Sequence, residues 1–137
     1  MKLERLVYCS RATVPTDSLL VVAEILSVSQ RNNDRDRLTG VLAVNDGWFL
    51  QVIEGSSDNI DRLIGRLEAD TRHKDIEILQ RIAVTGRLFE KWSMASARIT
   101  PSLRPDLVAL INECRTSPED AVIALAQIVA LHDMVDT

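Results

Sequence analysis

Apolar and polar residues follow two different spacings along this chain. Alternation of apolar and polar residues is typical of a strand with one buried face, whereas apolar residues at i, i+3, i+4 and i+7 are typical of an amphipathic helix. The alternating segments, which we predict to be strands, are residues 3–9, 38–44, 48–54, 76–84 and a segment near 92–99. The helices that we predict run from about 17 to 31, over 60–67, from about 102 to 114 and over 121–131.

Polar residues mark the boundaries of these elements. Thr16 or Asp17 is placed to cap the first helix, and residues 32–37 form a polar break after it. The segment Asn45–Gly47 predicts a tight hairpin between the second and third strands. Ser117 followed by Pro118 and two acidic residues predicts the start of the last helix.

The order strand, helix, strand, strand, helix, strand corresponds to two split βαβ units. We therefore predict an α+β fold: ferredoxin-like βαββαβ with an added fifth strand and two C-terminal helices. In this arrangement both early helices cover one face of an antiparallel sheet. The last helix is apolar nearly all round, which favours burial on the open face of the sheet or in a subunit interface.

Composition excludes several classes of function. The chain has 137 residues, 46% of them hydrophobic, which suits one globular domain. A net charge of −4 argues against binding to nucleic acid, and no apolar run approaches the roughly 20 residues of a membrane helix. Cys9 and Cys114 are far apart, and a charged N-terminus precedes the first strand, so we expect reduced thiols in a cytoplasmic protein with no nucleic-acid or membrane partner.

Gln51 is an amide inside the otherwise apolar run 48–53. Strand alternation places it on one face with Phe49 and Ile53, where an unpaired amide costs about 1–3 kcal/mol. Tyr8, the only tyrosine, lies in another apolar strand pattern and is a candidate partner. A satisfied core amide and a satisfied core tyrosine remain the ordinary alternatives.

Other polar or bulky residues occur near the same predicted core. Asn32 and Asn33 follow the first helix, Arg66 lies beside the apolar stripe of the second, and Trp92 and Met94 share a face of the last strand. Together they could surround a planar, hydrogen-bonding ring between the helices and the sheet, since amides both donate and accept and arginine suits a carbonyl or a phosphate. Taken singly, each also fits a structural role.

His73 and His132 show no spacing to a partner, and we expect them on the surface.

Several segments, in one order, resemble the BLUF family, the sensors of blue light using flavin. They are residues 5–10, 29–33, 38–40, 49–55, 70–73 and 89–94. The resemblance implies a noncovalently bound flavin between the two helices, most often FAD, with FMN or riboflavin as alternatives. It also implies that residues 1–99 form the flavin-binding domain and that residues 100–137 form a helical extension.

The resemblance further implies roles for particular residues. Tyr8 is expected to donate an electron to the excited flavin, Gln51 to bridge Tyr8 and the flavin, and Trp92 and Met94 to be the switch pair of the last strand. The residues expected to bind the flavin are Tyr8, Asn32, Asn33, Gln51 and Arg66.

A photoreceptor of this kind is not an enzyme and signals by contact. We expect a separate downstream protein as its partner, and the apolar last helix favours a homodimer or a larger homo-oligomer. Two alternative functions involve no flavin. One is an acylphosphatase-like hydrolase, although residues 9–13 lack the glycines of a phosphate-binding loop. The other is a ferredoxin-like interaction module.

Overall fold

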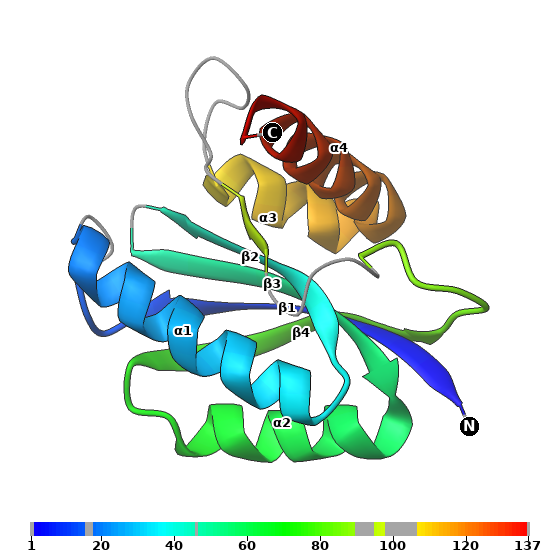
Figure 1. The fold of residues 1–137 in the computed structure, drawn as a ribbon, viewed down its shortest axis with the longest axis horizontal. Helices are drawn as coiled ribbons and strands as arrows, with labels where there is room; N and C mark the ends of the chain where they lie inside the picture. The colour runs from blue at the N-terminus through cyan, green and yellow to red at the C-terminus, as the bar shows by residue number, and fades with distance from the viewer. Residues whose placement is uncertain (1, 16–17, 46, 90–94, 98–106, 137) are drawn as a thin grey trace.

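A twisted sheet lies between two layers of helices in this protein (Figure 1). The computed structural model describes residues 2–15, 18–45, 47–89, 95–97 and 107–136. The strands are β1 Leu3–Ala12, β2 Thr39–Asn45, β3 Trp48–Ser56, β4 His73–Ala83 and β5 Ala95–Ala97. The helices are α1 Leu19–Arg35, α2 Ser57–Ala69, α3 Leu107–Thr116 and α4 Pro118–Asp136.

The described strands form one sheet in the order β4-β1-β3-β2-β5. β1 lies between β3 and β4 and is antiparallel to both, and β2 and β3 form an antiparallel hairpin. The α+β ferredoxin-like arrangement with C-terminal helices is therefore confirmed. β5 runs parallel to β2, with Val41 opposite Ala95. The remainder of the segment predicted near 92–99 lies outside the described residues.

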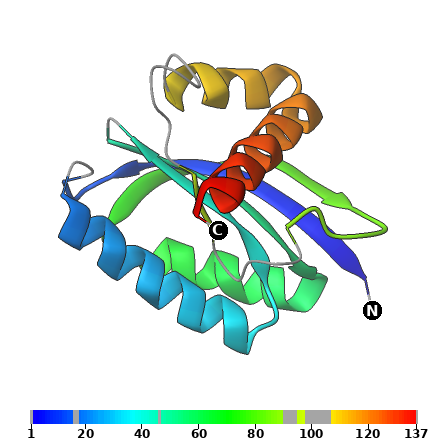
Figure 2. The same cartoon turned by 45° about the horizontal axis from the view of Figure 1, so that its top comes forward.

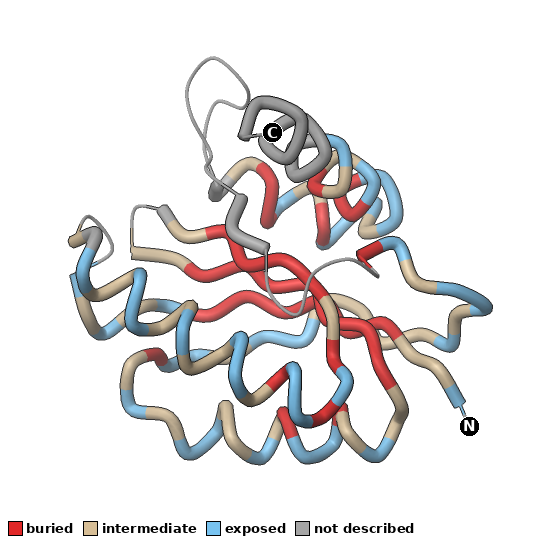
Figure 3. The backbone as a smooth tube through the Cα atoms, in the orientation of Figure 1, coloured by how far each residue is buried: buried red, intermediate tan, exposed pale blue. Residues whose placement is uncertain are grey.

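Strand alternation divides the core into two clusters, one on each face of the sheet. The cluster under α1 and α2 contains Leu6, Tyr8, Leu42, Phe49, Ile53, Ile60 and Leu63. The cluster under α3 and α4 contains Val7, Cys9, Val41, Leu50, Val52, Leu110, Ile111, Cys114 and Leu125. Figure 2 shows the two helical layers on opposite sides of the sheet, and Figure 3 shows that the central strands are the most deeply buried part of the chain.

The boundaries of α1 differ from the prediction in a way that matters for the site. The N-cap is Ser18, whose Oγ accepts the Val21 N–H at 3.4 Å, so the cap predicted at Thr16 or Asp17 is wrong. The helix continues to Arg35 and includes Asn32 and Asn33, which were predicted to follow it. Asparagine is only a moderately poor helix former, so two asparagines do not by themselves end a helix.

The start predicted near residue 102 for the first C-terminal helix lies outside the described residues, and α3 begins at Leu107. Over the part of the chain that the structure describes, no helix is both long and apolar enough to cross a membrane.

Candidate functional site

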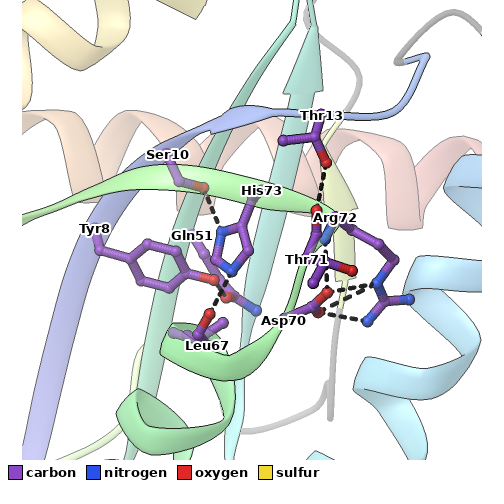
Figure 4. A network of polar contacts seen from close by, with 9 residues as sticks. All are labelled: Tyr8, Ser10, Thr13, Gln51, Leu67, Asp70, Thr71, Arg72 and His73. Carbon is purple, nitrogen blue, oxygen red and sulfur yellow. Dashed lines mark hydrogen bonds and ion pairs between the residues drawn. The ribbon is translucent and has the colours of Figure 1, made fainter.

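Tyr8 and Gln51 form a hydrogen-bonded pair in the core. β1 and β3 place the two residues directly opposite each other, so their side chains share one face of the sheet. The Tyr8 hydroxyl donates to Gln51 Oε1 (Figure 4). The residues are only 3% and 4% exposed, respectively. Tyr8 is thus the partner that the apolar strand patterns indicated for Gln51.

The surroundings of Tyr8 hold its phenol in the neutral form. Burial in the apolar core is the larger cause, and the nearby Asp70 carboxylate adds to it, so the pKa of Tyr8 is raised above its ordinary value. A neutral phenol can donate its hydroxyl hydrogen in the hydrogen bond to Gln51. Removal of an electron from this ring would leave a buried positive charge, which is costly unless the hydroxyl proton also moves away.

A cleft opens beside this pair, between α1, α2 and the sheet. Among its lining residues are all the predicted binding residues: Tyr8, Asn32, Asn33, Gln51 and Arg66. Trp92 and Met94, the predicted switch pair, lie outside the described residues.

The last turns of α1 bring the two asparagines to the cleft. Asn33 is 1% exposed, and Asn32 is half-buried. Their backbone oxygens accept hydrogen bonds from the turn that follows, from Asp36 N–H to Asn32 at 3.1 Å and from Leu38 N–H to Asn33 at 2.8 Å. The asparagines are therefore fixed by the chain reversal between α1 and β2.

Arg66 enters the cleft from the last turns of α2. Its Nη1 donates to Asp36 Oδ2 at 2.7 Å. Hydrogen bonds from Arg35 and then Arg66 hold the pKa of Asp36 below its usual range. Within the described residues, Arg66 Nη2 is buried and has no hydrogen-bond partner. A buried guanidinium N–H without an acceptor is unfavourable, so this atom suits a ligand oxygen in the cleft.

His73 was predicted on the surface, and this prediction is wrong. β4 begins at His73, and the side chain is buried at 9% exposure. Its Nε2 lies 2.8 Å from the Leu67 carbonyl oxygen, and its Nδ1 lies 2.8 Å from Ser10 Oγ (Figure 4). Because a carbonyl oxygen only accepts, Nε2 is the donor to Leu67. The ring contacts Phe49 edge-on, with centroids 6.3 Å apart.

The loop between α2 and β4 contributes a carboxylate to the cleft. Asp70 accepts the Arg72 backbone N–H at 2.9 Å and the Arg72 guanidinium at 2.6 Å. The Arg72 hydrogen bond is the main reason that the pKa of Asp70 is lowered. Thr13 Oγ1 donates to the Thr71 backbone oxygen, which ties this loop to the end of β1.

Asp70, Arg72 and His73 all line the cleft, although the sequence assigned them no individual role. The sequence pointed to these residues only through segment 70–73, which is one of the segments that resemble the BLUF family. Spacing alone could not find the burial of His73, because its partner Ser10 lies on β1, far away in sequence.

The ferredoxin-like sheet, the cleft beneath α1 and α2 and the buried tyrosine–glutamine pair have the features of a domain that encloses a planar, hydrogen-bonding ring. Residues 3–95 match the BLUF family, described as sensors of blue light using FAD. The chain belongs to the BLUF family of blue-light photoreceptors.

Similar proteins are found among sequences and among solved structures. Photoactivated adenylate cyclase subunit beta of Euglena longa is 33% identical over 98 residues, which is 71% of this chain. The dark-state structure of BlrB, a BLUF protein, covers 96% of this chain and 97% of that chain at 29% identity, with a TM-score of 0.71. Klebsiella pneumoniae BlrP1 with FMN and cyclic diGMP covers 82% of this chain and 29% of that chain at 24% identity, with a TM-score of 0.63. The last of these shows the fold alone.

This chain is short compared with its curated relatives. It spans between 10% and 12% of the length of those it matches.

Proposed function

We propose that the cleft binds a flavin, FAD in the first place with FMN or riboflavin as alternatives, and that Tyr8 and Gln51 carry the response to blue light. The observation that carries this proposal is the Tyr8–Gln51 hydrogen bond on the wall of a cleft. Family membership supports the class of cofactor. One structural neighbour, BlrP1, was solved with FMN, which keeps FMN among the candidates.

The residues of the cleft fit such a ring. Arg66 Nη2, buried without a partner among the described residues, would donate to a ring carbonyl oxygen. Asp36 holds the guanidinium in place through Nη1. Asn33 would hydrogen-bond the carbonyl edge of the ring, Asn32 would bind the ring or its neighbourhood, and Gln51 would lie between the ring and Tyr8.

When bound and excited by blue light, the flavin supplies a strong oxidant next to Tyr8. Tyr8 would give an electron to the excited ring, and its hydroxyl proton would move along the existing hydrogen bond to Gln51 Oε1. The proton cannot stay behind, because a positive charge on a buried phenol is costly to leave without water or a counter-ion. When the electron and the proton return to Tyr8, Gln51 would be left rotated or tautomerised, with its amide donating towards the carbonyl edge of the ring.

A carboxamide suits this step because its two ends have nearly the same shape and opposite hydrogen-bonding character. Gln51 thus has two arrangements of similar free energy, and a change in its hydrogen bonds is enough to move it between them. The stronger hydrogen bond at the carbonyl edge shifts flavin absorption to the red.

Readout requires a second element that responds to the change at Gln51. We assign it to the switch pair Trp92 and Met94 and to the extension 100–137, which follows the flavin-binding domain 1–99. The protein acts without turnover of its own, on a downstream signalling protein or through a homodimer or larger homo-oligomer. The two buried free thiols, Cys9 and Cys114, suit a cytoplasmic location.

The test uses Tyr8→Phe and Gln51→Leu. Both variants should bind flavin, because other cleft residues hold the ring, and both should lose the reversible red shift seen in wild type after blue illumination. Gln80→Leu is the matched control, since Gln80 lies on β4 and does not line the cleft. This control should keep the shift. A normal shift in either Tyr8→Phe or Gln51→Leu would refute the proposed mechanism.

A further inference from the structure

Glu54 is a fully buried carboxylate on β3, at 0% exposure. Strand alternation turns it away from Gln51, towards the sheet face that α3 and α4 cover. Its Oε2 accepts Arg5 Nε at 3.0 Å and the Leu88 backbone N–H at 3.0 Å. Its Oε1 accepts the Phe89 backbone N–H at 2.8 Å. One side chain of β3 thus holds the backbone of the segment that leads from β4 towards β5.

Arg87 holds the same segment from the other side. Its Nη1 donates to Thr39 Oγ1 at 2.8 Å and to the Glu54 backbone oxygen at 2.9 Å. Its Nη2 donates to the Arg37 backbone oxygen at 2.9 Å. Arg87 therefore joins the end of β3 to the turn between α1 and β2.

These contacts meet at residues that border the cleft without lining it. The turn reached by Arg87 also fixes Asn33, through the hydrogen bond from Leu38 N–H to the Asn33 oxygen. Glu54 lies on β3, and Arg87 bonds the backbone of β3 at the same residue. The same strand carries Gln51, three residues before Glu54. The chain that they hold, residues 87–89, continues towards β5 at the edge of the sheet, next to β2.

Stability alone does not account for this arrangement. A buried ion pair such as Arg5–Glu54 contributes little net stability, because desolvation of both charges opposes their attraction. The two side chains instead fix the local geometry. Glu54 accepts two backbone N–H groups, and Arg87 donates to three oxygen atoms. Hydrogen bonds to charged groups in a buried setting are directional and strong.

We infer that Glu54 and Arg87 are positioning residues that couple rearrangements of the cleft to β5 and the helices after it. This inference rests on the proposed function. A shift of β3 at Gln51, or of the turn that holds Asn33, moves Glu54 or the acceptors of Arg87. Leu88 and Phe89 then follow, because their backbone N–H groups are bonded to the Glu54 carboxylate, and Arg87 follows through the acceptors that its side chain binds.

Arg87→Met tests the inference with two readouts in the flavin-loaded full chain. The first is the reversible red shift, which reports the cleft. The second is the light-minus-dark difference in amide hydrogen exchange over residues 95–97 and 107–136. We expect Arg87→Met to keep the red shift and to lose the light-dependent exchange difference.

The matched control is Arg81→Met. Arg81 is a half-buried arginine that bonds Glu4 Oε1 at 2.8 Å and Asp61 Oδ1 at 2.7 Å, away from the turn and from residues 87–89. This control should keep both readouts. If Arg87→Met fails to fold, Arg87→Lys serves in its place, because a single ammonium cannot span the three acceptors and should also lose the exchange difference.

The outcomes separate the two proposals. A wild-type protein that shows no red shift overturns the proposed function. A wild type with a red shift but without a light-dependent exchange change at 95–97 overturns the coupling inference alone. Retention of the exchange change in Arg87→Met, or in Arg87→Lys when that variant replaces it, also overturns the coupling inference.

Discussion

Two buried polar groups at the cleft differ in how they are satisfied. Gln51 Oε1 accepts a hydrogen bond from the Tyr8 hydroxyl, so this pair is formed before any ligand binds. Arg66 is only half satisfied among the described residues, with Nη1 bonded to Asp36 and Nη2 buried without an acceptor. At the scale of single residues, the photochemical pair is preformed by the fold, whereas the arginine is prepared for an incoming oxygen.

Arg66→Gln should weaken flavin binding without removing the Tyr8–Gln51 pair. The lost hydrogen bond from a charged donor contributes about 1.5–3 kcal/mol, which corresponds to roughly a 10- to 150-fold higher Kd. Titration of the protein with flavin, followed by fluorescence, measures the change. Arg62→Gln is the control, because Arg62 is exposed on the same helix and bonds only its neighbour Asn59 among the described contacts. Equal affinities for the two variants would show that Arg66 does not touch the flavin.

The distances between elements are set in part by glycines. At Gly40 on β2, an added Cβ would lie 1.9 Å from the Val52 backbone oxygen on β3, so the two strands approach closely only without a side chain. At Gly65 on α2, an added Cβ would meet no atom within 4 Å. At the scale of elements, one glycine permits strand pairing, and the other only weakens a helix.

Substituting alanine at these two glycines should therefore have opposite effects. Gly65→Ala should raise the free energy of unfolding by about 0.5–1 kcal/mol, because alanine loses less conformational freedom in a helix. Gly40→Ala should lower it by about 1–3 kcal/mol or more, because the neighbouring atom is backbone and cannot turn away. Urea denaturation measures both changes. Destabilisation by Gly65→Ala, or a neutral Gly40→Ala, would contradict the packing described here.

Several ion pairs link different elements of the molecule. Arg66–Asp36 joins α2 to the end of α1, and Arg115–Glu77 joins α3 to β4. In both pairs the arginine side chain helps to lower the pKa of the acid in the folded state. At the scale of the whole molecule, these pairs make the contacts between elements depend on pH.

The sign of this dependence follows from the lowered pKa values of Asp36, Asp70 and Glu77. In the unfolded chain such groups titrate near 3.9 for Asp and 4.3 for Glu, and their stabilising effect is present above those values. The free energy of unfolding should thus be nearly constant from about pH 7 to pH 5 and should fall as the pH drops below about 4.

Denaturant unfolding at a series of pH values measures this dependence. Asp36→Asn should be less stable at neutral pH and should lose less stability in acid than wild type does. An acid transition of the same size in wild type and Asp36→Asn would show that this pair is not part of the effect.

Much of the architecture could be predicted from the sequence because its signals are local. The alternation in residues 3–9 and 48–54 and the helical spacing over 60–67 depend only on nearby residues and on the pleat or turn of the backbone. The same alternation assigned Tyr8 and Gln51 to buried faces. The end of α1 was misplaced, because polar residues at 32–35 are compatible with either a helix end or a loop.

The sequence by itself thus determined the order of the elements, the division of the strands into two faces and the presence of an amide that needed partners. Only the tertiary structure decided the register that places Tyr8 opposite Gln51, the burial of His73, the pairing of Arg66 with Asp36 and the hold of Glu54 on residues 87–89. The physical reason is the separation along the chain of the residues that interact. Backbone periodicity is set by neighbours in the chain, whereas each of these contacts forms only where separate elements have packed against one another.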